Sequence, residues 1–396
     1  MKVSLTYEMQ NDVLSLFPEL EKDLSGLRTT GTLPFQDIEE MVHSERLSAT
    51  QPITQSQIQP ASVDLRLGSE AYLIPASFLP GKHHAVLQKL RHIDHEVLDL
   101  TQPTILERGK IYLVPLLESL RLPVAVWAKA NPKSTSGRLD VFTRLITDYG
   151  TEFERVPCGY KGPLYLEIMP RSFSIQVHAG TRLCQLRFIR GTPTSSDTSL
   201  NLLNQHEPLV YLADDQPGDP VISEGLWISA DLLGDGGGDT VGYKAKSTST
   251  PIDLEKVDYY DSAEFWEPIT AVPEHPLCLA ADQCYILLSR ERLRVPPAWA
   301  AEMVPFDPSV GEFRVHYAGF FDPGFGYGDD TVKGTPAVLE VRSHGIPFML
   351  EHGQMLGRFV FERLLSAPSR LYGAAIGSSY HRQGLCLSKQ FRRGGI

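Results

Sequence analysis

Charged and hydroxyl side chains crowd into residues 131–140, which read NPKSTSGRLD and follow a long apolar stretch. Ser, Thr, Gly and Asn gather in surface turns for backbone reasons alone, so a polar turn is one interpretation. The other is an anion site, in which Lys133 and Arg138 supply charge and three short residues between them supply hydroxyl donors: Ser134, Thr135 and Ser136. Taken alone, the segment favours the turn.

A glutamate recurs in two apolar strands, each of which follows a turn. Glu167 ends CGYKGPLYLE, and Glu340 ends AVLE after FFDPGFGYG. A strand carboxyl among apolar groups tends to have a raised pKa, which suits a general base. A solvated glutamate on an open strand face is the alternative. The recurrence favours a ligand-facing carboxylate, although shared ancestry would also preserve it.

The chain repeats itself. IYLVPLLESLRLP (111–123) matches CYILLSRERLRVP (284–296), and residues 164–191 match 337–364, with Tyr112 and Tyr285 lying 173 residues apart. One offset shared by two separate segments predicts a tandem duplication. A weaker match of SVDLRLG (62–68) with TVGYKAK (240–246) indicates where each copy begins.

Short apolar or alternating runs punctuated by Pro and Gly begin near residue 60 and are typical of an all-β protein. Short helices are expected before them, in DVLSLFPELEKDL and in LPFQDIEEMVHSERL, where Ile38, Met41 and Val42 share one face. We predict an N-terminal arm at 1–30, a first domain at 31–215 and a second at 216–396.

Bulk composition disfavours several functional classes. The formal net charge of −11 disfavours non-specific nucleic-acid binding. No run has the length of a membrane span, and the N-terminus lacks a signal-peptide pattern. The five cysteines form no CxxC pair, which argues against a zinc site and predicts a reducing cytoplasm. GDGGGD (234–239) lacks the Lys-Ser/Thr of a phosphate loop, so a flexible loop is expected there.

With these features in place, residues 31–396 resemble the dCTP deaminase branch of the dUTPase-like superfamily. The resemblance rests on segments that stand in the family's order: IQPASVDLRLG (58–68), KSTSGRLD (133–140), YAGFFDPGFG (317–326), VLE (338–340) and GSSYHRQGLCLSK (377–389). The two-copy form further resembles a bacterial subgroup of double-length dCTP deaminases. It implies a mainly β chain with a tandem pair of distorted β-barrel or jelly-roll domains.

The resemblance also implies a reaction. dCTP would lose ammonia and become dUTP without zinc, in the synthesis of dUMP and dTTP precursors. A glutamate, Glu340 or its counterpart Glu167, would take a proton from the water that attacks carbon 4 of cytosine. Ser134 would orient that water, Arg138 would lie beside it, and the backbone carbonyl of Ala318 would contact it.

Substrate contacts follow from the same resemblance. The phosphate-side motif, the hairpin and the closing tail would supply Lys133, Thr135, Ser136, Asp322, Gly324, Phe325, Tyr380, Gln383 and Lys389. Magnesium would bind to the triphosphate rather than to protein side chains. The single-copy relatives are trimers, so a homo-oligomer is expected, and feedback inhibition by dTTP is left open.

The two copies depart from the single-copy pattern in complementary ways. The first keeps Ser134 and Arg138 but has Phe153 near the place of the hairpin alanine; the second keeps the hairpin but has DPSVGEF in place of the Ser/Arg motif. We therefore expect one composite site that joins Ser134 and Arg138 to Ala318 and Glu340, with the other glutamate structural or in a degenerate site. By analogy with the subunit-spanning sites of the relatives, an inter-chain site is slightly preferred.

Other functions stay open at this point. Asp322 resembles the hairpin aspartate with which dUTPases activate water, so dUTP hydrolysis, alone or coupled to deamination, is one alternative. A nucleotide-binding regulator without catalysis is another. A zinc deaminase is disfavoured because the H-x-E…P-C-x-x-C signature is absent.

Overall fold

The computed structural model describes residues 29–234, 239–272, 275–304, 313–316, 319–327, 333–373 and 384–392, with the backbone alone at 313–316. The predicted mainly β class is confirmed. The helix expected around Ile38 is α2 (Phe35–His43), which buries Ile38 and Met41. The helix expected in DVLSLFPELEKDL lies outside the described residues. None of the described helices is long and apolar enough to cross a membrane.

The first half forms two main sheets that contribute to one hydrophobic core. One has the strand order β5–β4–β7–β11–β9, with β2 also on β7, and the other has the order β1–β13–β8–β10, with β3 also on β13. The elements besides α2 are β1 (Gly31–Thr32), β2 (Leu47–Ala49), η2 (Gln55–Gln57), β3 (Val63–Arg66), β4 (Glu70–Ile74), α3 (Val86–Leu90), β5 (Glu96–Asp99), β6 (Thr104–Leu106), β7 (Ile111–Arg121), β8 (Val126–Pro132), α4 (Ser134–Gly137), β9 (Val141–Thr147), β10 (Arg155–Val156), β11 (Lys161–Pro170), β12 (Ile175–Val177) and β13 (Arg182–Arg190).

The second half repeats this architecture. Its sheets have the orders β18–β16–β20–β24–β22, with β14 also on β20, and β15–β26–β21–β23. Its elements are α5 (Asp197–His206), β14 (Val210–Tyr211), β15 (Leu226–Ser229), β16 (Thr240–Ala245), β17 (Ile252–Asp253), α6 (Ser262–Phe265), β18 (Trp266–Thr270), β19 (Leu277–Leu279), β20 (Cys284–Leu293), β21 (Trp299–Val304), β22 (Phe313–His316), β23 (Phe320–Phe321), β24 (Thr335–Ser343), β25 (Phe348–Leu350) and β26 (Met355–Arg363).

The matching strand orders confirm the tandem duplication. β20 begins 173 residues after β7 (284 − 111), as β26 does after β13 (355 − 182). The weaker sequence match is wrong, because TVGYKAK forms β16, the counterpart of β4, whereas β3 corresponds in its pairing to β15. A match of seven residues with strand-like alternation is too short to distinguish one strand of a sheet from another. β14 joins the second half although it precedes the predicted start at residue 216.

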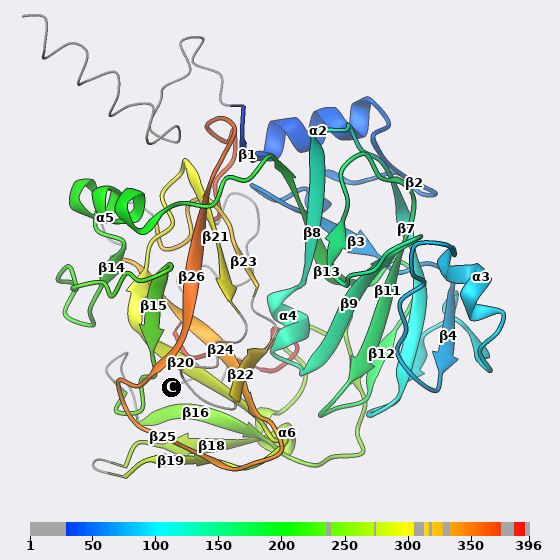
Figure 1. Cartoon of the computed structure of the whole chain (residues 1–396). Helices are drawn as coiled ribbons and strands as arrows, with labels where there is room; N and C mark the ends of the chain where they lie inside the picture. The colour runs from blue at the N-terminus through cyan, green and yellow to red at the C-terminus, as the bar shows by residue number, and fades with distance from the viewer. Residues whose placement is uncertain are drawn as a thin grey trace, which may run out of the picture.

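The two halves lie side by side, with α4 of the first half facing the second (Figure 1). Aromatic rings bridge them: Phe173 of the first half packs against Trp266 and Phe265 of the second, with ring centroids 5.3 and 5.5 Å apart. β17 adds to the first half by pairing in parallel with β12. The second half therefore completes the core of the first.

Ion pairs also cross the junction between the halves. Lys129 of β8 contacts Glu302 of β21, and its Nζ lies 2.7 Å from Glu362 Oε1 of β26. The fully buried Arg187 of β13 reaches Asp322, with Nη2 and Oδ1 3.1 Å apart. Because these partners come from different halves, each pair constrains how the halves dock.

Replacement of Phe173 by alanine should test the aromatic bridge. The side chain is 0 % exposed, and loss of a buried phenyl ring typically costs about 3–5 kcal/mol. We expect Phe173→Ala to lower the free energy of unfolding, measured by urea denaturation, by that amount. Val124→Ala, at an 88 % exposed position, should change it by about 0.5 kcal/mol or less. Equal small effects in the two variants would contradict the bridge.

Candidate active site

A cavity of about 740 Å³ opens where the two halves meet. The first half lines it with α4 and the start of β13, and the second half lines it with β23, β24 and the C-terminal tail. The KSTSGR segment is therefore part of a pocket wall and not a solvated turn. The segment folds this way because β8 ends at Pro132, Lys133 is the N-cap, and Ser134–Gly137 make the single turn α4.

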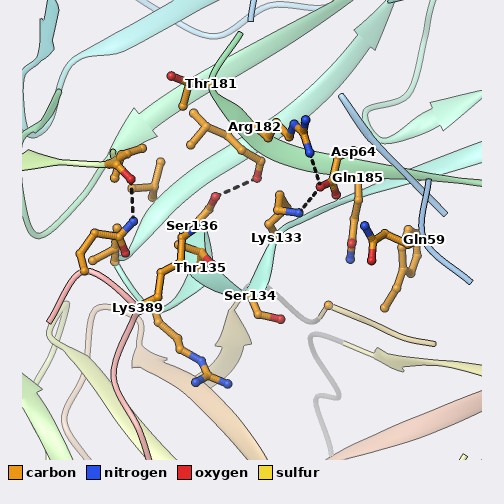
Figure 2. A pocket seen from close by; sticks show the side chains of 18 of the residues that line it. Gln59, Asp64, Lys133, Ser134, Thr135, Ser136, Thr181, Arg182, Gln185 and Lys389 are labelled. Carbon is orange, nitrogen blue, oxygen red and sulfur yellow. Dashed lines mark hydrogen bonds and ion pairs between the residues drawn. The ribbon is translucent and has the colours of Figure 1, made fainter. Parts of the chain in front are cut away.

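Positive charge gathers at one end of this cavity. Lys133 Nζ lies 2.5 Å from Asp64 Oδ2, and Arg182 Nη1 lies 3.7 Å from the same oxygen. Figure 2 shows both side chains converging on Asp64. Lys389 also lines the cavity, and burial, followed by the nearby charge of Lys133, lowers the pKa of its ammonium group. Such a cluster of cations suits a phosphate-bearing ligand.

The three hydroxyl residues of α4 make different contacts. Ser136 is buried, and its Oγ donates to the carbonyl of Leu183 at 2.8 Å, which ties α4 to β13. Ser134 points to the opposite side of the turn (Figure 2) and lines the cavity. The carbonyl oxygen of Thr135 accepts from Ser388 Oγ of the tail at 3.1 Å. Ser134 and Thr135 thus line the cavity, whereas the Ser136 hydroxyl is engaged by a backbone carbonyl of β13.

Arg138 and Glu340 face one another across the junction. Arg138 Nε lies 4.0 Å from Glu340 Oε1, and the two side chains are only 3 % and 7 % exposed. Arg138 Nη1 also donates to the carbonyl oxygen of Cys386 in the tail at 3.1 Å. One guanidinium of the first half therefore contacts both β24 and the tail of the second.

Burial raises the pKa of Glu340 from 4.5 to about 8, and the charge of Arg138 opposes that rise. The cause is desolvation: a carboxylate cut off from water is disfavoured relative to the neutral acid. A carboxyl with this pKa exchanges a proton readily near neutral pH, so Glu340 can act as a general acid or base. The raised pKa expected for a strand glutamate is present here.

Glu167, the counterpart of Glu340, has a different environment. Its Oε1 accepts from Arg144 Nη2 at 2.6 Å and from Arg144 Nε at 2.9 Å. The same guanidinium stacks on Phe153, 3.8 Å from the ring centre. Glu167 does not line the cavity that Glu340 lines. In this half the ion pair and the phenyl ring occupy the space beside the carboxylate.

The remaining predicted residues divide into three groups. Asp322 and Phe325 line the cavity, and burial raises the pKa of Asp322 while Arg187 opposes the rise. Gly324 is not among the described lining residues; its φ of 92° makes the turn after β23. The others lie outside the described residues: Ala318, Tyr380 and Gln383.

Sequence reasoning missed several lining residues, namely Gln59, Asp64, His178, Thr181, Arg182, Gln185, Tyr372 and Gln390. Asp64 lies inside the quoted SVDLRLG segment, so a charged residue between the apolar Val63 and Leu65 was the available signal. For Arg182, at the start of a strand, the sequence offers no comparable signal. Its position depends on how β13 pairs with β3 and β8.

The structure brings Ser134, Arg138 and Glu340 together within one chain. The composite arrangement of the two copies was expected, whereas the slight preference for an inter-chain site is not what the structure favours. No second chain is needed to bring the Arg138 guanidinium to the Glu340 carboxyl.

The raised pKa of Glu340 predicts a pH-dependent cost to stability. The folded state holds this proton more tightly than the unfolded state does, so the stabilisation is complete below about pH 4.5 and is lost as the pH rises through about 8. Glu340→Gln removes the titration. We therefore expect Glu340→Gln to unfold at a higher temperature than the wild type, by a margin that grows from pH 5 to pH 8.5. A margin that does not depend on pH would contradict the assigned shift.

Two protein-family models together match most of the chain. Residues 29–192 match the model of the 2'-deoxycytidine 5'-triphosphate deaminase (DCD) N-terminal domain, and residues 196–391 match that of the C-terminal domain. A crystal structure of 2'-deoxycytidine 5'-triphosphate deaminase from Agrobacterium tumefaciens is 48% identical, with a TM-score of 0.81, and the match covers 85% of this chain and all of that one.

Curated relatives are shorter and match about two fifths of the chain. Proteins named "dCTP deaminase, dUMP-forming" from Coprothermobacter proteolyticus and Nanoarchaeum equitans are 30% and 25% identical, over 38% and 41% of this chain and 77% and 85% of their own lengths. Both domain models and the 48%-identical structure point the same way, and the chain belongs to the 2'-deoxycytidine 5'-triphosphate deaminase family.

Proposed function

We propose that this chain hydrolyses dCTP to dUTP and ammonia, with Glu340 as the general base. The observation that carries the proposal is the buried carboxyl of Glu340, with a pKa of about 8, facing Arg138 across the cavity between the halves. Family membership supplies the substrate class, and the pocket supplies groups with matching chemistry.

The proposed reaction needs the ionised form of Glu340. The carboxylate takes a proton from a water molecule, and the water oxygen bonds to carbon 4 of cytosine. The proton then passes to the amino group, the bond from carbon 4 to the amino nitrogen breaks, and ammonia leaves. The remaining hydroxyl proton moves to nitrogen 3 of the ring, which gives the carbonyl group of uracil. Arg138 stabilises the ionised carboxylate, which offsets part of the cost of burial. Ser134 lines the same cavity and would hold the water through its hydroxyl.

The cationic end of the cavity would take the triphosphate. Lys133, Arg182 and Lys389 lie there, so the base would point towards Glu340. Among the described residues no group of three or more His, Cys, Asp or Glu is arranged to hold a metal ion. Mg²⁺ is a hard cation that usually keeps several waters, so we propose that phosphate oxygens of the substrate and water hold it.

Chelation of magnesium tests this arrangement. We expect EDTA to raise the KM for dCTP and a zinc-selective chelator to leave the rate unchanged. Tightly bound zinc in the purified protein, together with loss of activity when it is removed, would contradict the proposed role of metal.

Product analysis decides how far the reaction proceeds. The curated relatives are named dUMP-forming, and Asp322 lies in this pocket, so onward hydrolysis of dUTP is the second candidate. Incubation with dCTP and Mg²⁺ should yield ammonia and dUTP in equal amounts. Equal amounts of dUMP and pyrophosphate would establish the coupled reaction instead. Homo-oligomerisation, cytoplasmic location and inhibition by dTTP stay predictions.

The two counterpart glutamates provide a matched pair of variants. Glu340→Gln should lower kcat by about 10²–10⁴-fold and leave the KM for dCTP nearly unchanged, because a general base acts on the chemical step. Glu167→Gln should retain substantial turnover, since its carboxylate binds Arg144 outside the cavity. Steady-state ammonia release measures both. Loss of turnover in Glu167→Gln alone would reverse the assignment of the two copies.

A further inference from the structure

A second buried ion pair crosses the junction beside the first. Asp140 follows Arg138 by two residues, and Arg342 follows Glu340 by two residues on β24. The guanidinium of Arg342 contacts the carboxylate of Asp140, and the side chains are 6 % and 1 % exposed. Ser172 Oγ donates to the same Asp140 oxygen at 2.5 Å. None of these three residues lines the cavity.

The two pairs are reciprocal in charge. In the first, the cation comes from the first half and the anion from the second; in the second, the order is reversed. Alternate residues of a strand share a face, so Glu340 and Arg342 both project from β24 towards the 138–140 segment. Two such contacts fix the distance between the segments and also their register, which one contact alone leaves free.

Both ends of the second pair are held by backbone contacts. Asp140 has a φ of 54°, in the left-handed region, and its N–H and carbonyl are hydrogen bonded to Gly137 and Arg171 at 2.8 and 2.9 Å. Arg342 also donates to the carbonyl of Asp282. Asp140 therefore sits on a backbone that is fixed by the first half, and the Arg342 guanidinium is held by a carbonyl of the second.

The pair belongs to this junction alone. Arg342 has no charged counterpart in the other copy, because the residue at the 173-residue offset is Met169, so the pair of charges is not repeated there. The pair thus occurs at the one junction where Arg138 meets Glu340. Purely apolar packing would hold two halves together at least as well as a buried ion pair.

We propose that Asp140 and Arg342 are positioning residues that set the separation of Arg138 from Glu340. The proposal rests on the proposed function, in which that separation governs how the water is held. Misplacement of catalytic groups by about 1 Å can lower the rate by about 10²-fold. Asp140 is also close enough to Glu340 to raise the pKa of its carboxyl, after the larger effects of burial and Arg138.

Two variants test the proposal. Arg342→Met gives the second copy the residue type that the first copy has at the equivalent position, Met169. Asp140→Asn removes the negative charge of the pair. Lys129→Met is the matched control, because it breaks another ion pair between the halves and leaves the cavity lining intact. We expect Arg342→Met and Asp140→Asn to lower kcat by about 10²-fold with the KM for dCTP changed by less than about threefold. The double variant should be no slower than either single variant, and Arg342→Lys should recover part of kcat.

Thermal unfolding of all variants separates an effect on the placement of Arg138 and Glu340 from an effect on the stability of the fold. Lys129→Met should lower the Tm as much as Arg342→Met and retain kcat within about threefold of the wild type. The proposal would be overturned if Lys129→Met and Arg342→Met lost kcat equally at matched Tm. It would also be overturned if Arg342→Met kept the kcat of the wild type.

A structural measurement makes the test independent of turnover. In a crystal structure of Arg342→Met, the distance between Arg138 Nε and Glu340 Oε1 should increase from 4.0 Å by about 1 Å or more. An unchanged distance would overturn the positioning role even if the wild type released no ammonia from dCTP. A wild type without ammonia release would by itself contradict the proposed function, so the two failures are distinguishable.

Discussion

The central constraint in this molecule is a carboxyl group taken out of water and placed opposite a guanidinium from another part of the chain. Desolvation of a charge is expensive, and a partner offsets the cost only if it is held at the right place. Glu340 sits on a strand of one half and Arg138 at the end of a short helix of the other. The docking of the halves, through aromatic rings, ion pairs and the C-terminal tail, therefore fixes the chemistry of the carboxyl.

The duplicated glutamates show how neighbours decide the role of one residue type. Both lie on equivalent strands, and both are buried. In the first half Arg144 stands opposite Glu167 in the strand register and stacks on Phe153; in the second half the residue opposite Glu340 is His316. The Glu167 carboxylate is held in a salt bridge with Arg144 of its own half. The Glu340 carboxyl lines the cavity.

Much of this arrangement was predictable from residue pattern. The shared offset predicted two equivalent β units, and the complementary motifs predicted that Ser134 and Arg138 would join Glu340. Asp64 and Arg182 were not predicted, because their convergence depends on the pairing of β3 with β13 and not on their local sequence. The Asp140–Arg342 contact could not be predicted for the same reason: its members are 202 residues apart, and although Asp140 ends the KSTSGRLD segment, Arg342 matches no motif.

The covalent connection between the two walls of the cavity has a consequence for assembly. Where such walls belong to separate molecules, the fraction of complete sites falls on dilution. In this chain the second wall is present at the high effective concentration that a tether imposes, and the aromatic contacts of Phe173 and Trp266 hold it docked. Completion of the pocket is thereby an intramolecular equilibrium, and its position does not depend on how much protein a cell contains.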